Sequence, residues 1–298
     1  MPMILQRFLS ALALAGLMGF GVCASASAEP TRITVVAAEN FYGDIARQIG
    51  GERVSVFSVL NSPEQDPHLF ENTPGVARQI ADANLIIVNG AGYDSWMEKL
   101  LAATPRPDRI VVNAARLVNA KPGDNPHLWF APATMPAVAE AIAAALSQAD
   151  TTHAAEYATR LQTVMAQLDR ITQRTAQLRA KHSGKPVTAT EPVFGPMAQA
   201  LDLAMRNERF QLGMMNDTEP SARDIAAFED DLKNHNVKAL IYNKQVSEKL
   251  TERLLAIAKQ AKVPVVGVTE TMPADVSFAD WMLGEMDALD KALTGPNS

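Results

Sequence analysis

Two histidines lie in nearly the same local context, and they are the first side chains of this sequence that could do chemistry. His68 lies in the segment Asp-Pro-His-Leu-Phe (66–70) and His127 in the segment Asn-Pro-His-Leu-Trp (125–129), although the chain has only 5 histidines. In each segment the proline holds the preceding residue extended, which favours a loop over the apolar face of a helix. Imidazoles in such loops can serve as metal ligands.

Two acidic residues occupy comparable positions in the second half of the chain. Glu191 directly follows a predicted strand at residues 186–190, and Glu270 directly follows one at residues 263–269. The two histidines likewise come after predicted strands, and ligand groups of open parallel sheets gather beyond the carboxyl ends of the strands. Two neutral imidazoles with two carboxylates suit a divalent first-row transition metal. The predicted metal ligands are His68, His127, Glu191 and Glu270.

Each candidate also has an alternative without metal. The histidines can be turn residues that hydrogen-bond to the backbone, and Glu191 can cap a following helix and interact with its dipole. Glu270 can be a solvated loop acid, in which case Asp275 is a substitute ligand. The strand-end positions and the repeated histidine motif favour the metal interpretation.

Neighbouring residues are expected to support the two imidazoles. Asp66 and Asn125 each stand two positions before a histidine and can orient its ring, as metal-bound histidines often require. Trp129 is close enough in sequence to line the same cleft, although aromatic residues are more often core. The remaining histidines lie in polar surroundings and are expected at the surface. They are His153, His182 and His235.

The elements that must position these residues follow from the hydrophobic pattern. Short β-branched runs alternate with amphipathic helical stretches from residue 32 onward, which is typical of parallel α/β structure. Strands are predicted at residues 32–37, 54–60, 85–89, 109–113, 186–190, 209–212, 237–242 and 263–269. Residues 151–181 keep a helical period with scarcely a glycine or proline. The sequence therefore predicts an α/β fold with two lobes of mainly parallel sheet flanked by helices, joined by one long spine helix.

Composition agrees with a folded protein of this size. The 298 residues exceed what one core usually covers, and 47% are hydrophobic while 20% are charged. A net charge of -6 and the lack of a basic cluster argue against nucleic acid as a partner. The expected organisation is a signal peptide (1–28), an N-terminal α/β lobe (29–148), a long linking helix (149–184) and a C-terminal α/β lobe (185–298).

The N-terminal residues predict export. Arg7 precedes an apolar run at residues 8–22, and small residues up to Ala28 form a cleavage site of a secretory signal peptide. The only cysteine, Cys23, lies in the segment to be removed, so the mature chain has no thiol. A lipid anchor at Cys23 is the alternative, but the preceding Val22 is larger than the small residue expected there.

These motifs resemble those of the solute-binding receptors of bacterial zinc and manganese ABC importers, the TroA/ZnuA-like cluster with a rigid helical spine. The resemblance covers essentially the whole mature chain. The family carries its first two ligands in Asp-Pro-His and Asn-Pro-His motifs, matched at His68 and His127. Its third ligand, a His or Glu after the spine, is matched at Glu191. Its fourth is usually Asp, and Glu270 stands there with one extra methylene.

The resemblance implies a periplasmic, monomeric receptor without enzyme activity, which delivers one divalent metal ion to the membrane permease of an ABC importer. Zinc receptors of the family commonly use three histidines and often a His-rich loop, and this chain has neither. Manganese or iron is therefore slightly favoured, and zinc, which accepts the same donors, is the close alternative. Two other functions stay open, a binding protein for an organic metal chelate and an exported metal-dependent hydrolase. The hydrolase is disfavoured because four protein ligands leave little room for a reacting water.

Overall fold

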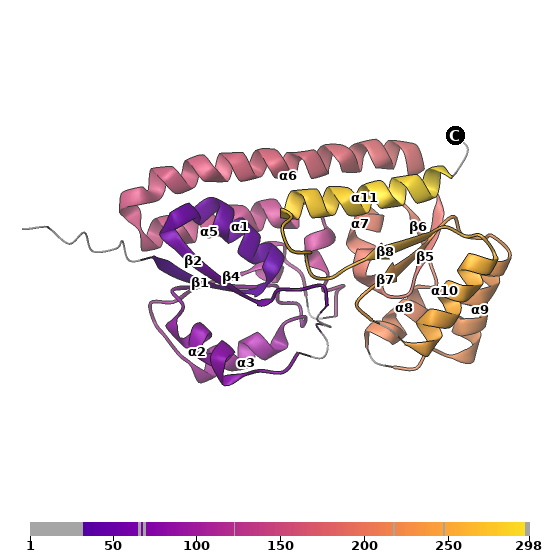
Figure 1. Ribbon diagram of the computed structural model, residues 1–298, viewed down its shortest axis with the longest axis horizontal. Helices are drawn as coiled ribbons and strands as arrows, with labels where there is room; N and C mark the ends of the chain where they lie inside the picture. The colour runs from indigo at the N-terminus through magenta and orange to yellow at the C-terminus, as the bar shows by residue number, and fades with distance from the viewer. Residues whose placement is uncertain are drawn as a thin grey trace, which may run out of the picture. The chain divides into compact units, whose positions relative to one another are not determined.

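Two four-stranded parallel sheets organise the protein (Figure 1). The structure is a computed structural model that describes residues 32–64, 67, 70–121, 123–216, 218–246 and 248–295. The first sheet has the order β2-β1-β3-β4, with β1 at Ile33–Glu39, β2 at Val54–Leu60, β3 at Leu85–Val88 and β4 at Ile110–Asn113. The second has the order β6-β5-β7-β8, with β5 at Pro186–Ala189, β6 at Ala204–Arg206, β7 at Leu240–Asn243 and β8 at Val265–Val268. The predicted fold class is confirmed.

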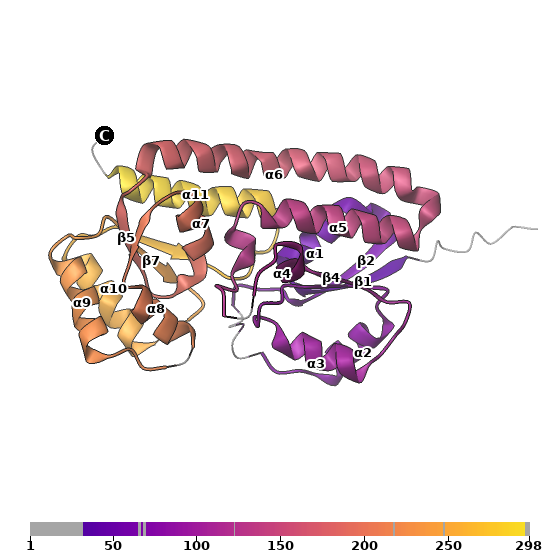
Figure 2. The ribbon, with the colours of Figure 1, turned by 180° about the vertical axis from the view of Figure 1, so that it is seen from behind.

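Helices cover both faces of the first sheet, which with these helices forms the N-terminal lobe (Figures 1 and 2). They are α1 (Asn40–Gly50), α2 (Pro74–Asp82), α3 (Ser95–Ala103), α4 (Ala114–Leu117) and α5 (Thr134–Ala149), with short 3-10 turns at Gly51–Arg53 and Leu128–Phe130. Val35 and Ala37 of β1 pack toward α1 and α5, whereas Val36 and Ala38 pack toward α2 and α3. Side chains alternate along a strand, so a strand that is covered on both faces must be apolar throughout.

The second sheet and its helices form the C-terminal lobe. Its helices are α7 (Gly195–Ala200), α8 (Glu208–Met215), α9 (Ala222–Lys233), α10 (Lys249–Gln260) and α11 (Phe278–Thr294), with a 3-10 turn at Pro192–Phe194. Val187 and Ile241 belong to the same buried cluster as residues of α7 and α11, whereas Leu240 packs with the helices of the opposite face, α8, α9 and α10. The C-terminal sheet is therefore also a central layer between helices.

The long helix α6 (Ala154–His182) follows a 3-10 turn at Thr151–His153 and is the predicted spine. Its 29 residues span about 44 Å. One continuous apolar cluster includes Tyr157 and Val164 of α6 together with core residues of both lobes. Helix α11 runs beside α6 in both views (Figures 1 and 2), and Arg174 of α6 contacts Asp287 and Asp290 of α11 at 2.7 and 2.8 Å. Both lobes are thus packed against one stiff element.

One predicted strand is wrong. Residues 209–212 lie within α8 rather than in a strand, and β6 precedes them. Phe210 and Met214, four positions apart, both enter the buried cluster beneath α9 and α10, which is helical spacing. Asn207 adopts a left-handed conformation (φ 60) immediately before the helix, and Asn tolerates this conformation better than most residues.

The expectation of a surface position is also wrong for His182. This side chain is buried, with 2% exposed, and its Nε2 atom lies 2.7 Å from Asp290 Oδ1. Asp290 lies 108 positions away in the sequence, so no local pattern indicates the contact. The pair fastens the end of α6 to α11.

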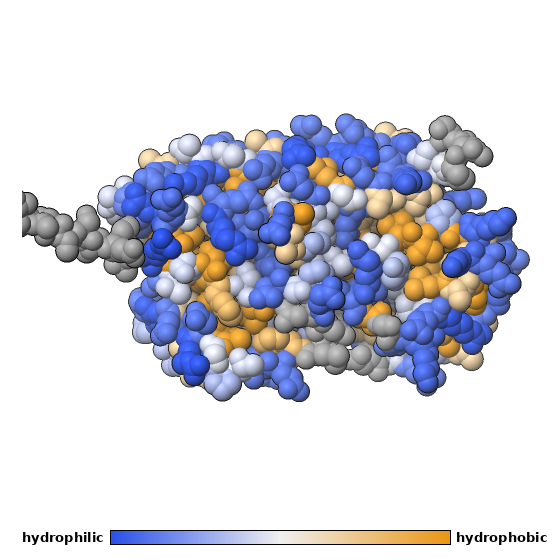
Figure 3. All heavy atoms as spheres, viewed as in Figure 1, coloured by the Kyte–Doolittle hydropathy of each residue, from blue (hydrophilic) through white to orange (hydrophobic). Residues whose placement is uncertain are grey.

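The face of the protein shown in Figure 3 is predominantly hydrophilic, and hydrophobic residues appear in separate areas. The exposed large apolar side chains of the described residues are Val111, Leu117, Leu212, Val265 and Val276, which belong to five different segments. Among the described residues, no helix is both long and apolar enough to cross a bilayer. The exposed apolar side chains therefore do not form one binding surface, and the polar residues between the two sheets are the better candidates for a functional site.

Candidate metal centre

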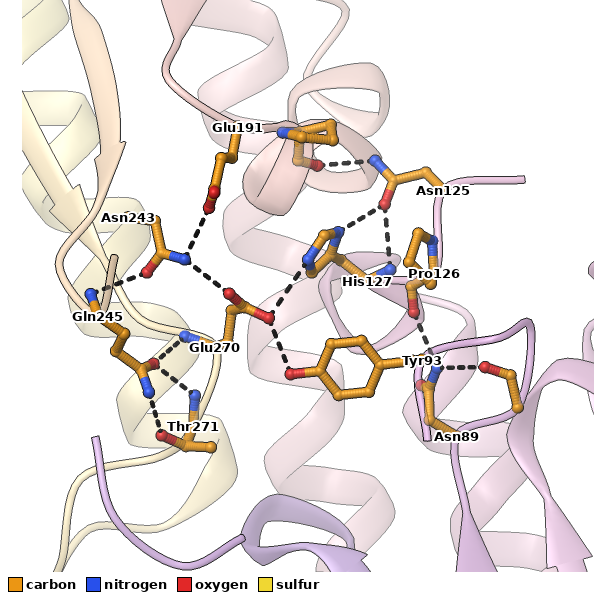
Figure 4. A network of polar contacts seen from close by, with 12 residues as sticks. Asn89, Tyr93, Asn125, Pro126, His127, Glu191, Asn243, Gln245, Glu270 and Thr271 are labelled. Carbon is orange, nitrogen blue, oxygen red and sulfur yellow. Dashed lines mark hydrogen bonds and ion pairs between the residues drawn. The ribbon is translucent and has the colours of Figure 1, made fainter. Parts of the chain in front are cut away.

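The site lies where the strand ends of both lobes meet (Figure 4). In the C-terminal sheet the strand order reverses between β5 and β7, and in parallel α/β sheets ligands bind at the carboxyl ends of the strands at such a point. Glu191 stands two residues after β5, and Asn243 is the last residue of β7. Glu270 stands two residues after the neighbouring β8. Both glutamates therefore lie just beyond the carboxyl ends of strands of the C-terminal sheet, as the sequence predicted.

The ring of His127 is held in one orientation by Asn125. The Asn125 Oδ1 atom accepts from the backbone N–H of His127 at 3.0 Å and lies 2.8 Å from its Nδ1. Because Asn125 Nδ2 donates to Pro192 O at 2.7 Å, the amide cannot be reversed without losing these contacts. Nδ1 therefore carries a hydrogen, and in the neutral form of the ring Nε2 carries the lone pair. This lone pair is aimed toward Glu270 (Figure 4).

Glu270 is fully buried and lies at the centre of the network. Its Oε2 atom is 3.4 Å from His127 Nε2 and accepts from the Tyr93 hydroxyl at 2.8 Å. Its Oε1 atom accepts from Asn243 Nδ2 at 2.6 Å. Gln245 Oε1 accepts from the backbone N–H of Glu270 at 2.5 Å. The alternative of a solvated loop acid is therefore wrong for this side chain.

Glu191 joins the same network through Asn243. The Asn243 Nδ2 atom donates to Glu191 Oε2 at 2.8 Å, and both residues are buried. Glu191 occupies the position before the short 3-10 turn at Pro192–Phe194, yet its side chain makes no capping hydrogen bond there. The capping alternative thus does not describe this carboxylate.

Tyr93 reaches Glu270 from a tight loop of the N-terminal lobe. Gly90 adopts φ 76, and a Cβ atom there would lie 2.7 Å from Asn113 Oδ1, so glycine is required. Asp94 accepts from the backbone N–H groups of Asn89 and Gly90 at 2.7 and 2.8 Å and closes the loop. Burial, with the charge of Glu270, raises the pKa of Tyr93 well above its ordinary value. Tyr93 therefore remains a neutral donor.

Further hydrogen bonds join the lobes around the site. Asn40 and Met272 make two buried bonds, Asn40 Nδ2 to Met272 O at 2.6 Å and Met272 N to Asn40 Oδ1 at 3.0 Å. The Thr271 hydroxyl donates to Ser62 O at 2.9 Å. These bonds are independent of His127 and Glu270. The lobes are therefore held together by more than the candidate ligands.

The structure thus connects three of the four predicted ligands, His127, Glu191 and Glu270, within one polar network. His68 and Asp66 lie outside the described residues. Within the described part of the chain, no group of three His, Cys, Asp or Glu side chains is arranged closely enough to hold an ion. The site as described is therefore a partial donor set with Asn243 between its carboxylates.

Two contributors were not predicted from the sequence. Asn243 and Tyr93 bind Glu270, but neither is a usual ligand type for a first-row ion. The signal that could have found Asn243 is its place at the end of an apolar strand, the same signal that indicated Glu191. Trp129 is almost fully buried and packs edge-on against His127, with ring centroids 5.4 Å apart. It supports the imidazole by packing.

Two parallel α/β lobes on a long helix, with an imidazole and two carboxylates meeting between them, define a two-lobed binding protein. The chain belongs to the family described as zinc-uptake complex component A, periplasmic (ZnuA), whose model matches residues 35–292. The resemblance inferred from the histidine motifs is thereby confirmed.

Individual relatives agree with this family over most of the chain. A manganese-binding lipoprotein, MntA, of Bacillus subtilis is 26% identical over 82% of this chain and 81% of its own. A metal ABC transporter substrate-binding lipoprotein, SloC, of Streptococcus mutans is 24% identical over 84% of each chain. The structure of the periplasmic zinc-binding protein TroA of Treponema pallidum superposes with a TM-score of 0.75 at 18% identity, over 88% of this chain and 99% of that one. This last similarity concerns the fold.

Proposed function

We propose that this protein is an extracytoplasmic receptor that captures one divalent transition-metal ion and delivers it to the membrane permease of an ABC importer. The family to which the chain belongs is described as a component of a zinc-uptake complex. One relative is named as the substrate-binding lipoprotein of a metal ABC transporter. The metal ion is cargo in this proposal, and the protein performs no reaction on it.

The observation that carries the proposal is the environment of His127 Nε2. This atom is buried and has no hydrogen-bond partner among the described residues, yet it lies 3.4 Å from Glu270 Oε2. A lone pair opposite a carboxylate oxygen is repulsive, and a cation between the two groups converts this repulsion into attraction. A metal ion supplies that cation and gives His127 Nε2 a partner.

We propose His68, His127, Glu191 and Glu270 as the ligands of this ion. Two carboxylates neutralise the charge of a divalent ion, which offsets the cost of burying it. Glu270 reaches within 3.4 Å of His127 Nε2, which supports the view that its extra methylene fits the site. Asn125 would act as the residue that orients an imidazole ligand, as such ligands usually require.

The donor set narrows the choice of ion. Two carboxylates in place of an imidazole-rich set suit Mn(II) or Fe(II), whereas the general order of affinities favours Zn(II) over both. Both metals occur among the similar proteins: one is named a manganese-binding lipoprotein, and another is named a periplasmic zinc-binding protein. We favour manganese or iron on donor hardness, and competition with zinc tests this ranking.

Export and assembly complete the proposal. The signal peptide (1–28) would be removed to leave a monomeric mature chain that begins at Glu29, with lobes at residues 29–148 and 185–298 and the linking helix at 149–184. The family description as periplasmic supports this location. Mass spectrometry of the exported protein tests it, because lipid attachment at Cys23 would give a different N-terminus and mass.

Titration calorimetry of the metal-stripped protein tests the site. We expect one equivalent of Mn(II) or Zn(II) to bind the parent, and His127→Ala and Glu270→Gln to lose about 100-fold or more in affinity, since each removes a direct ligand. His235→Asn is the matched control, because His235 is exposed and its positive φ of 55 suits asparagine. Unchanged affinity in folded His127→Ala would refute the proposed site.

A further inference from the structure

Asn89 directly follows β3, is fully buried, and uses its backbone N–H and both ends of its amide in hydrogen bonds. Its backbone N–H donates to Asp94 Oδ2 at 2.7 Å, and its Oδ1 atom accepts from the Tyr42 hydroxyl at 2.8 Å. Its Nδ2 atom donates to Gly90 O at 3.0 Å and to Pro126 O at 2.8 Å (Figure 4). The bond to Pro126 joins this strand end to the loop of the candidate metal centre.

The direction of the Asn89 amide follows from these contacts. Gly90 O and Pro126 O are carbonyl oxygens that can only accept, so the amide nitrogen must face them. Its two hydrogens provide one for each carbonyl. A reversed amide would bring its oxygen against both carbonyls and lose two hydrogen bonds. The Asn89 nitrogen is therefore a fixed donor to the Pro126 carbonyl.

The peptide group between Pro126 and His127 is held at both of its polar atoms. Asn89 Nδ2 donates to the carbonyl oxygen, and the N–H of His127 donates to Asn125 Oδ1 at 3.0 Å. Because a peptide group is planar, these two anchors fix its orientation and with it the position of the His127 Cα atom. Asn125 is itself bound to Pro192 of the C-terminal lobe, whereas Asn89 directly follows a strand of the N-terminal sheet. The anchor at Asn89 therefore does not depend on the contact between the lobes.

The backbone at His127 forms a turn that is closed at the same carbonyl. His127 has φ -77 and ψ 54, close to the values of an inverse γ-turn, and the Leu128 N–H donates to Pro126 O at 2.7 Å. Such a turn has one internal hydrogen bond, so contacts from outside contribute much of its rigidity. A carbonyl oxygen has two lone pairs, and Asn89 donates to the same oxygen. His127 therefore lies at the tip of a turn whose closing carbonyl is bound twice.

We propose that Asn89 is a positioning residue for metal binding, which holds the Pro126 carbonyl so that the imidazole of His127 stays at the site. This inference rests on the proposed metal-receptor function. His127 Nε2 lies 3.4 Å from Glu270 Oε2, so a small rotation of the turn moves the imidazole away from its neighbour. Without Asn89 the ion must restore this position when it binds. Asn89 does not itself contact the ion.

Titration calorimetry with Zn(II) and Mn(II) on the metal-stripped parent and Asn89→Ala tests the proposal. We expect both ions to bind Asn89→Ala about tenfold more weakly, as for other residues that orient metal-bound histidines. Asn89→Ser is a second variant, whose hydroxyl is one bond shorter than the amide and keeps a partner for Tyr42 but does not reach Pro126. We expect the same loss from it, and it carries the test if the alanine variant does not fold.

Asn84→Ala is the matched control for a purely structural effect. Asn84 precedes β3 at its opposite end, and its Oδ1 atom accepts from the backbone N–H of Thr34 at 3.0 Å. We expect this substitution to lower the urea midpoint of unfolding but to leave both metal affinities within about twofold of the parent, because distant sites act independently. A loss of affinity equal to that of Asn89→Ala would overturn the proposed role.

Asn89→Ala in a His127→Ala background shows whether Asn89 acts through this imidazole. We expect the residual affinity to change by less than about twofold there, because the residue that Asn89 positions is gone. A purely structural role would give the same loss in both backgrounds, and that result would overturn the proposal.

The outcomes also separate this inference from the proposed function. If the parent binds neither ion, the receptor function fails and this inference fails with it. If the parent binds metal and His127→Ala weakens binding, but folded Asn89→Ala keeps the affinity of the parent, only the role of Asn89 is refuted.

Discussion

Glu285 on α11 gives the sharpest test of the energetics around the site. Its Oε1 atom accepts from the backbone N–H of Thr269 at 3.1 Å and from Trp281 Nε1 at 3.0 Å, whereas its Oε2 atom has no hydrogen-bond partner among the described residues. Burial raises the pKa of Glu285 from 4.5 to about 8, against the opposing effect of these hydrogen bonds. The carboxyl group that supports the residue before Glu270 is therefore protonated in the folded protein at neutral pH.

Comparison of the parent with Glu285→Gln makes the raised pKa of Glu285 measurable as a pH dependence of stability. Between the pKa of the unfolded chain, 4.5, and that of the folded protein, about 8, the folded state binds the additional proton. The free energy of unfolding of the parent must therefore fall as pH rises through this window. At about 1.4 kcal/mol per pH unit, the total loss has an upper limit of about 5 kcal/mol. Glutamine keeps the accepting oxygen and does not titrate, so the variant lacks this contribution.

Urea unfolding of metal-free parent and Glu285→Gln at a series of pH values measures the effect. We expect the stability of the variant relative to the parent to increase by several kcal/mol from about pH 5 to about pH 8 and to level off above that. Glu140→Gln on α5 is the control, because Glu140 is exposed, and its relative stability should not change in this window. A difference between Glu285→Gln and the parent that stays constant with pH would refute the reasoning.

Three further substitutions test other parts of the structure. Asn125→Ala should weaken metal binding about 10- to 100-fold by calorimetry, because His127 loses its orienting partner; full affinity would contradict this. Asn40→Ala should lower the free energy of unfolding by about 1–3 kcal/mol in urea, since Met272 then has two unpaired buried groups, and no change would show that water replaces them. Trp129→Ala should cost about 3–5 kcal/mol in the same assay, whereas a loss below about 1 kcal/mol would show that the indole is not core.

Most of the fold could be predicted from the sequence because strands that are buried on both faces are recognisable as short runs of apolar residues. Residues 85–88 are apolar at every position since both faces of β3 are covered, and glycines at positions 50 and 51 mark the end of α1. The exception at residues 209–212 covered only four positions, too few to distinguish a helical from an extended period. The burial of His182 depends on Asp290, a partner 108 positions away.

The site was predictable only where residue type and strand position pointed the same way. His127, Glu191 and Glu270 are metal-binding residue types at strand ends or in a repeated motif. Asn243 and Tyr93 are not such types, and their partners lie far away in the sequence, 52 positions from Asn243 to Glu191 and 177 from Tyr93 to Glu270. The contact of Asn243 depends on the pairing of β5 with β7 in the C-terminal sheet, and the contact of Tyr93 depends on how the two lobes pack.

The measurement that tests the central claim most directly is the metal content of the protein after export to its native compartment. Elemental analysis of the purified mature chain should find one equivalent of a divalent transition metal in the parent, and little or none in His127→Ala prepared in the same way. Full retention of metal by His127→Ala would contradict the proposed site. The absence of stoichiometric metal from the parent would contradict the receptor function itself and favour an organic ligand.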